Sequence, residues 1–156
     1  MLEEEIKLIE TLTNYVILIG VVSNDTNRKS TIASVGITNA ELMFIHENGS
    51  PLRNIPARPV LEKTIKWAEL KFLDVINICI EGIFNGWQKN EIEKELNKLC
   101  MRMEKYARRL IYDNDGRLAS NAPSTIKKKG FNHPLFVTGQ LARSITCTLS
   151  TKLNLE

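Results

Sequence analysis

Two long stretches with helically spaced apolar residues, separated by a short break, most constrain the fold of this 156-residue chain. In the first stretch the apolar residues follow in steps of three and four: Leu61, Ile65, Ala68, Phe72, Val75 or Ile76, Cys79 and Ile83. Gly82, Asn85 and Gly86 break the pattern. A second stretch, from about Lys89 to Tyr112, has Ile92, Leu96, Leu99, Met103, Tyr106 and Leu110 at the same spacing. The sequence therefore predicts two helices of about 24 residues, each roughly 36 Å long.

Shorter elements surround this pair. A helix is predicted over Leu2–Leu12, a hairpin from Tyr15–Val22 and Thr31–Thr38, and a short helix from Asn39 to about Glu47, with Asn39 as its cap and Leu42, Ile45 and Phe44 facing inward. Short helices are also predicted over Pro123–Lys129 and Thr138–Ser144. The alternating segment Ile145–Thr151 predicts a strand that returns to the sheet begun by Tyr15–Val22. We expect one α+β domain over residues 1–156, a small, mainly antiparallel sheet packed against two long helices plus short helices.

The charge of the chain is unevenly distributed. The net charge is only +3, but residues 116–155 contain no acidic residue and carry Arg117, Lys127, Lys128, Lys129, Arg143 and Lys152. Such a segment can meet an acidic protein, nucleic acid or only solvent. Lys127–Lys129 with Phe131 and His133 could bind phosphate and stack on a base, so a nucleic-acid-binding module is one hypothesis.

The cysteines and the start of the chain bear on its compartment. Cys79, Cys100 and Cys147 are widely spaced, odd in number and set among apolar neighbours, which favours buried reduced thiols. The first residues are acidic where a secretory signal would be basic. The early apolar run is shorter than the roughly 20 residues that span a bilayer. We expect synthesis in the cytoplasm, without export or membrane insertion.

Sequence patterns typical of catalysis are weak. His46 is followed by Glu47, but Ser50 stands where a zinc-protease helix needs its second histidine. The glycines lack the spacing of a phosphate-binding loop, and most carboxylates stand where they stabilise helices. We expect neither enzymatic activity nor a cofactor or metal, and we keep a small metal-dependent enzyme around His46 and Glu47 only as a third hypothesis.

Residues 54–59, Asn-Ile-Pro-Ala-Arg-Pro, have a restrained backbone. Pro56 and Pro59 each disfavour helical angles in the residue before them, and Pro59 suits the first turn of a helix. We call residues 54–59 the strap, and we expect it to lead stiffly into the first long helix.

Two stretches together resemble the minor tail-component or tail-completion family of long-tailed bacteriophages, also described as neck or head–tail joining proteins. The first is Ala40-Glu-Leu-Met-Phe-Ile-His-Glu-Asn-Gly49, continuing through Asn54-Ile-Pro-Ala-Arg-Pro-Val-Leu61. The second is Ala122-Pro-Ser-Thr-Ile-Lys-Lys-Lys-Gly130, continuing through Pro134-Leu-Phe-Val-Thr-Gly-Gln-Leu-Ala-Arg-Ser-Ile145. The chain departs from the usual family pattern at Asn48, at Val137 and just before Ala122.

The resemblance implies a structural virion protein, made in the host cytoplasm, that assembles as a ring expected to be a hexamer at the head-proximal end of the tail. Its partners would be other copies of itself, the tail tube or tail terminator protein, and the head–tail connector, with possible transient contact with passing DNA. A tail terminator that controls tail length is an alternative within the same class.

A ring needs heterologous contacts that close on themselves. We expect the strap at one such contact, with Arg58 paired to an acid of the next subunit, although a purely internal strap is equally open. Docking on the tail tube or connector is expected at Ser23–Ser30 and at Lys127–His133. The interface candidates are Ile55, Pro56, Arg58, Pro59, Lys127, Lys128, Lys129, Phe131 and His133.

Overall fold

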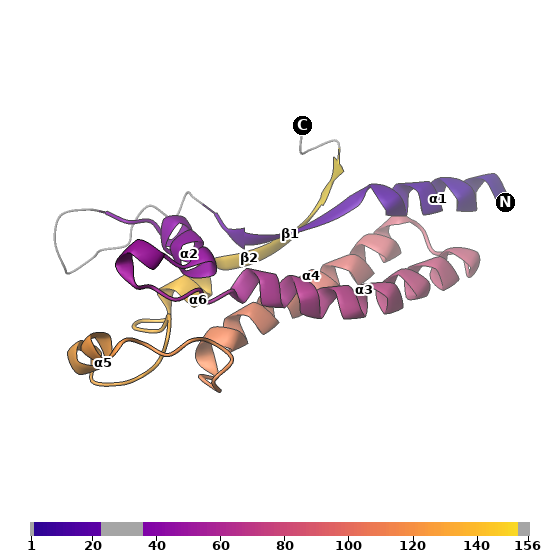
Figure 1. The fold of residues 1–156 in the computed structure, drawn as a ribbon. Helices are drawn as coiled ribbons and strands as arrows, with labels where there is room; N and C mark the ends of the chain where they lie inside the picture. The colour runs from indigo at the N-terminus through magenta and orange to yellow at the C-terminus, as the bar shows by residue number, and fades with distance from the viewer. Residues whose placement is uncertain (1, 23–35, 153–156) are drawn as a thin grey trace. The chain divides into compact units, whose positions relative to one another are not determined.

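The computed structural model describes residues 2–22 and 36–152, which form an α+β fold (Figure 1). The elements are, in chain order, α1 (Leu2–Asn14), β1 (Tyr15–Val21), α2 (Asn39–Asn48), a 3₁₀ turn (Pro51–Arg53), α3 (Val60–Phe84), α4 (Lys89–Tyr112), α5 (Pro123–Lys129), α6 (Gln140–Ser144) and β2 (Ile145–Thr151). The predicted fold class is confirmed. The two long helices lie where the apolar spacing predicts them.

The chain divides into two compact units. The helical unit consists of Met1–Ile19, Ile65–Glu104 and Cys147–Glu156, and the strap unit consists of Gly20–Thr64 and Lys105–Thr146. Each boundary falls inside a helix or strand, so β1, α3, α4 and β2 all contribute residues to both units. The expectation of a single domain stays a prediction.

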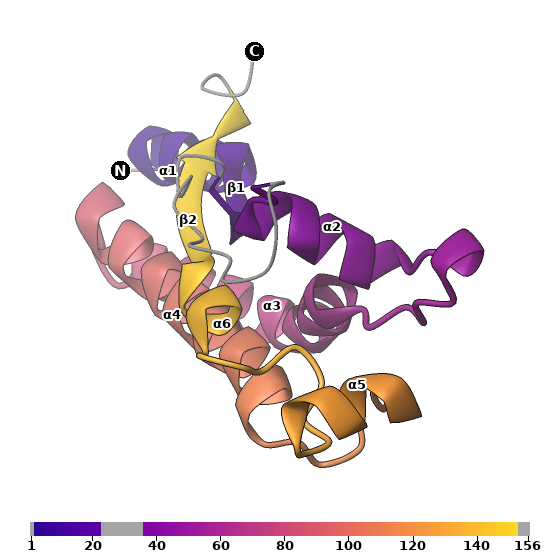
Figure 2. The ribbon, with the colours of Figure 1, turned by 90° about the vertical axis from the view of Figure 1, so that its left-hand side faces the viewer.

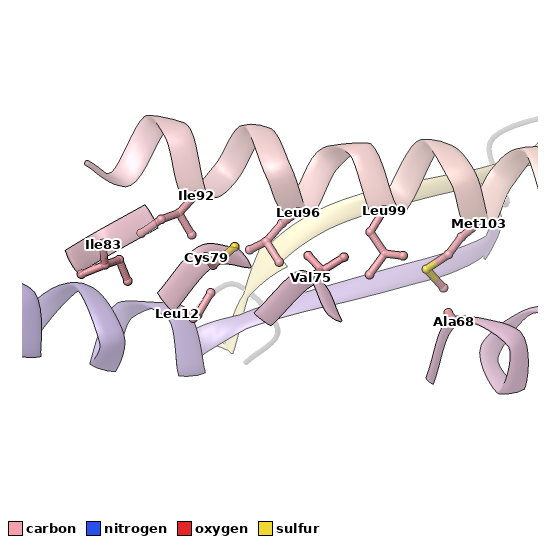
Figure 3. Packing of buried hydrophobic residues seen from close by; sticks show 9 residues of the cluster. All are labelled: Leu12, Ala68, Val75, Cys79, Ile83, Ile92, Leu96, Leu99 and Met103. Atoms are coloured by element: carbon pink, nitrogen blue, oxygen red, sulfur yellow. The ribbon is translucent and has the colours of Figure 1, made fainter. Parts of the chain in front are cut away.

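The core of the helical unit is a layer of apolar side chains between its helices. Figure 3 shows the α4 side chains turned toward residues of α1 and α3. Burial of each large aliphatic side chain contributes about 1.5–3 kcal/mol. The predicted buried face of α4 is confirmed in this unit, where the buried cluster consists of Leu12, Ala68, Val75, Cys79, Ile83, Ile92, Leu96, Leu99 and Met103.

The predicted face of α3 is only partly correct. Ala68, Val75, Cys79 and Ile83 are buried, but Ile65 and Phe72 are 45% and 42% exposed. The sequence contains apolar residues around most of α3, and the core of the helical unit covers only one of its sides. Leu70 and Leu73, at 76% and 69%, are among the most exposed apolar side chains of the described residues.

The sheet pairs a strand near the start of the chain with one near its end. β1 pairs with β2 in a two-stranded antiparallel sheet, which confirms that the late strand returns to the first. Tyr15, Ile17 and Ile19 alternate along β1 and pack on the helical core, as do Cys147 and Leu149 of β2. The hairpin partner expected at Thr31–Thr38 falls largely outside the described residues, and residues 36–38 are not a strand.

α2 begins one residue earlier than its expected cap implies. Thr38, rather than Asn39, caps the helix: its hydroxyl accepts a bond from the Glu41 amide, and the Glu41 carboxylate accepts one from the Thr38 amide. The inward residues also differ, since Met43 is buried whereas Phe44 is 69% exposed. α2 packs against α6 in the strap unit.

The three cysteines bear out the expectation of free thiols. All three cysteines carry free thiols; Cys79 and Cys100 are buried and Cys147 is half-buried. Across residues 2–22 and 36–152, none of the helices combines the length and the apolar character that crossing a membrane requires.

Candidate functional site

The strap is fixed to the end of α2 by backbone hydrogen bonds. After α2 the chain passes through the 3₁₀ turn and returns to the start of α3 (Figure 2). Ser50 and Ile55 exchange two backbone hydrogen bonds of 2.8 and 3.0 Å, and the Arg58 amide donates to the His46 carbonyl oxygen. Gly49 has a φ of 73°, and a Cβ there would lie 2.8 Å from the Ala57 nitrogen. The turn into the strap therefore requires glycine.

Arg58 joins the strap to a segment about 60 residues later. Its side chain is 96% buried, with 4% exposed. Nε donates to the Ala119 carbonyl oxygen at 2.7 Å, and Nη2 donates to that of Ser120 at 2.8 Å. Nη1 lies 3.2 Å from His46 Nδ1. A guanidinium has only donors, so this ring nitrogen accepts. The strap is thus internally bonded at Arg58, where an ion pair with the next subunit was expected.

A cavity of about 300 Å³ lies against the strap, and we call it the strap cavity. It combines residues from both stretches that carry the family resemblance. Two of its residues, Asn54 and Leu135, have positive φ angles of 50° and 59°. Asparagine adopts this conformation readily, whereas for Leu135 it is strained, and such strain concentrates at functional sites. The lining residues are Leu42, His46, Asn54, Ile55, Pro56, Arg58, Asn121, Ala122, Thr125, Lys129, Leu135 and Val137.

The strap cavity is cationic. Lys129 Nζ donates to the carbonyl oxygens of His133 and Phe136 at 2.8 and 2.6 Å. Burial, and then the nearby Arg58 guanidinium, lower the pKa of Lys129, while burial lowers the pKa of Arg58. Among the described residues, neither aspartate nor glutamate lines the cavity. Two positive side chains therefore face one cavity without a lining carboxylate.

Asn121 adds an unused donor to the same cavity. Its Nδ2 atom is buried and has no hydrogen-bond partner in the described part of the chain. Its backbone amide is held by the Asn132 side-chain oxygen at 3.0 Å, which fixes the residue in place. Leaving a buried donor unpaired costs about 1–3 kcal/mol, which makes the site receptive to an acceptor.

The predicted interface residues differ in their exposure, and only some of them line the cavity. Lys127, Lys128 and Pro56 are exposed, Phe131 is 44% exposed, and Pro59 is half-buried. His133 is half-buried, and its Nε2 lies 2.6 Å from the Ile111 carbonyl oxygen, to which it donates. Ile55, Pro56, Arg58 and Lys129 line the cavity, whereas Pro59, Lys127, Lys128, Phe131 and His133 do not. Ser23–Ser30 lies outside the described residues.

His46 and Glu47, the pair behind the metal-enzyme hypothesis, have separate structural contacts. His46 faces Arg58, whereas the two Glu47 oxygens accept bonds from the Leu61 and Glu62 amides at 3.0 and 2.7 Å. Glu47 thus caps the start of α3, where the helix dipole favours a negative charge. No cluster of three or more metal-binding side chains occurs within the described ranges 2–22 and 36–152.

The helical unit carries a separate, apolar groove of about 440 Å³. Leu12 and β1 line one part, and α3 and α4 line the rest. Ile65 and Phe72, the exposed members of the predicted α3 face, both lie in this groove, and so does Leu73. This surface offers apolar area to another protein.

Asn121 and Leu135 are among the strap-cavity residues that sequence reasoning did not propose for a site. Asn121 stands in an ordinary polar stretch, and Leu135 carries no chemical group that draws notice. The available signal was indirect: the segment after Gly116 contains no acid before residue 156, and Arg58 was the cation expected to pair.

These observations define a small α+β protein with a cation-lined cavity in one unit and an apolar groove in the other. The chain matches no protein-family model, and searches of curated proteins and of solved structures likewise found no match.

Proposed function

We propose that this chain is a structural virion protein that forms a ring at the head-proximal end of a long-tailed bacteriophage tail, completes the tail and joins it to the head connector. Its partners are further copies of itself, expected to number six, the tail tube or terminator protein, and the connector. The resemblance of residues 40–61 and 122–145 to tail-completion proteins supports this function.

The exposed apolar surface of α3 carries the proposal. Leu70 and Leu73 are 76% and 69% exposed, and Leu73 also lines the apolar groove. Covering such a side chain with a partner stabilises the complex by roughly 1.5–3 kcal/mol before the costs of association. A subunit that functions by assembly needs this kind of surface, and a ring requires it to meet a different surface on the next copy.

The strap cavity supports the same function. Residues 40–61 and 122–145 lie far apart in the chain, yet both supply its lining, and Arg58 holds the strap to residues 119 and 120. The two stretches therefore pack together, as expected for a protein that presents a fixed surface to several partners.

The nucleic-acid alternative has weaker support. Of the three consecutive lysines, Lys129 lines the strap cavity, whose volume of about 300 Å³ suits a single side chain better than a nucleotide. Lys127 and Lys128 remain exposed on α5. Two exposed lysines add only a modest phosphate-binding and salt-dependent contribution.

Deleting the gene from its parent phage or prophage and viewing the lysate by electron microscopy tests the proposal. Separate DNA-filled heads and finished tails are the expected result. Overlong tails would instead indicate a tail terminator, and normal infectious particles would overturn the structural function. Steeply salt-dependent binding of free duplex DNA, abolished by neutralising Lys127 and Lys128, would favour the nucleic-acid alternative.

A further inference from the structure

The strap cavity has the composition of a carboxylate-binding site. A guanidinium has five N–H donors and an ammonium group has three. Arg58 uses three donors within the chain and Lys129 uses two, with its ammonium nitrogen also 5.0 Å from the Phe131 ring centroid, so both retain N–H groups for a further acceptor. The buried Nδ2 of Asn121 is a third donor, and it has no acceptor in the described part of the chain.

Electrostatics favour an anion at this place. Arg58 is 96% buried, and its charge lowers the pKa of Lys129, so each cation raises the cost of the other. Across the described residues, the lining contains no acid that would offset this repulsion. An oxyanion between the two cations would accept hydrogen bonds from both and relieve it.

The rest of the lining favours a protein side chain as the source of the anion. Leu42, Ile55, Pro56 and Leu135 surround the donors with apolar surface. A free inorganic anion would leave that surface without a partner, whereas the methylene groups of an acidic side chain can pack on it. A volume of about 300 Å³ is at the lower end for ligand pockets, so it suits one side chain better than a nucleotide.

We propose that the strap cavity binds the carboxylate of an aspartate or glutamate presented by a partner protein, with Arg58, Lys129 and Asn121 as the donors. The inference rests on the proposed function only in that the partner is a protein. The positive segment after Gly116 would then serve to attract an acidic partner surface before this contact forms.

The direct test is an NMR titration of the full chain with propionate, which reproduces the end of a glutamate side chain. Saturable shifts of the Asn121 side-chain amide and the Arg58 Nε–H signals are expected, and propionamide, the uncharged analogue, should give none. Lys129→Gln should weaken binding by about tenfold, the usual scale for one charge-assisted hydrogen bond. Lys127→Gln and Lys128→Gln, the matched changes on the exposed part of α5, should leave affinity within about twofold.

A second variant keeps the test informative if Lys129→Gln fails to fold. Asn121→Asp places a carboxylate inside the cavity, so it should abolish propionate binding and raise the melting temperature. Ser124→Asp, which adds the same charge at an exposed position of α5, should keep binding and raise the melting temperature less.

Three results would overturn the inference: equal responses to propionate and propionamide, a destabilised Asn121→Asp chain that still binds propionate, or displacement of propionate by equimolar inorganic phosphate. The last would assign the cavity to phosphate. Failure of the titration leaves the gene-deletion result unaffected, and normal particles after gene deletion would leave a positive titration standing, so the two proposals can fail separately.

Discussion

At the scale of single residues, close contacts decide what each position tolerates. Arg58 is the clearest example, because two of its three side-chain hydrogen bonds go to carbonyl groups some 60 residues away. Gly82 is another: a Cβ at this position would lie 2.2 Å from the Trp87 ring, which folds back over the end of α3. The Trp87 amide also donates to the Gly82 carbonyl oxygen at 2.8 Å, which holds the ring close.

Gly82→Ala is therefore expected to destabilise the protein. The clash should cost about 1–3 kcal/mol, offset by the roughly 0.5–1 kcal/mol that alanine gains over glycine in a helix. Urea denaturation should show a net loss of up to about 2.5 kcal/mol in the free energy of unfolding. Gly20→Ala is the control, since nothing lies within 4 Å of its added Cβ. Equal stabilities of the two variants would contradict the prediction.

At the scale of elements, the helix starts depend on side chains outside the helix core. The reciprocal hydrogen bonds of Thr38 and Glu41 cap the N-terminus of α2. The N-terminus of α3 is capped by Glu47, which lies near the end of α2 and accepts hydrogen bonds from two backbone amides of α3. The first arrangement is readable in sequence because its members are three residues apart. The second is not, because 14 residues separate Glu47 from Leu61.

Glu47→Ala should destabilise the start of α3. Removing both acceptors leaves two amides at the first turn without their bonds, at a cost of about 0.5–2 kcal/mol. Hydrogen exchange should accelerate at the Leu61 and Glu62 amides in particular. Asp74→Ala, an exposed acid on the same helix, should change stability by less than about 0.5 kcal/mol. Unchanged exchange at Leu61 would rule out the cap.

The α2 capping box should respond to pH. Bonds from the Thr38 amide and hydroxyl lower the pKa of Glu41 below its usual 4.5. A lowered folded-state pKa means that the contribution of Glu41 is fully present above about pH 4.5 and is lost as the pH falls through the folded value. An NMR titration of the Glu41 carboxyl carbon should give a midpoint below 4.5, and Thr38→Ala should move it upward. An identical midpoint in both proteins would refute this cause.

At the scale of the whole molecule, different residues of α3 are expected to determine stability and assembly. The core of the helical unit buries Ala68, Val75, Cys79 and Ile83, and these contacts do not involve Leu70 or Leu73. Substituting the exposed pair should therefore leave the fold intact and affect only what binds there.

The double change Leu70→Glu and Leu73→Glu should block assembly in phage complementation. Each lost leucine contact removes roughly 1.5–3 kcal/mol, so association should weaken by at least about 100-fold. Few joined particles are expected when the variant replaces the wild-type gene, although urea unfolding of the purified chain should change little. Lys71→Glu, on an exposed position of α3, should complement normally. Normal particle yield from the double variant would show that this surface is not an interface.

The sequence by itself determined the elements whose signals are local. The spacing from Ile92 to Met103 predicted a buried face of α4, and alternation predicted β2, because both periods depend only on backbone geometry. The sequence also indicated the strap but left open whether it lies at a subunit contact or is internal, and the hydrogen bonds of Arg58 are internal. It placed the α2 cap one residue late, at Asn39, although the spacing of Thr38 and Glu41 is that of a capping box.

Only the tertiary structure decided which apolar side of α3 is buried and where the polar partners lie. α3 carries apolar residues on most sides, so the choice between Val75 and Phe72 depended on what packs against it. Asn121 and Lys129 line the same cavity as Arg58 although more than 60 residues of sequence separate them from it, and the cavity exists only where these segments meet. Contacts between distant segments depend on how the whole chain folds, and a local sequence pattern does not encode them.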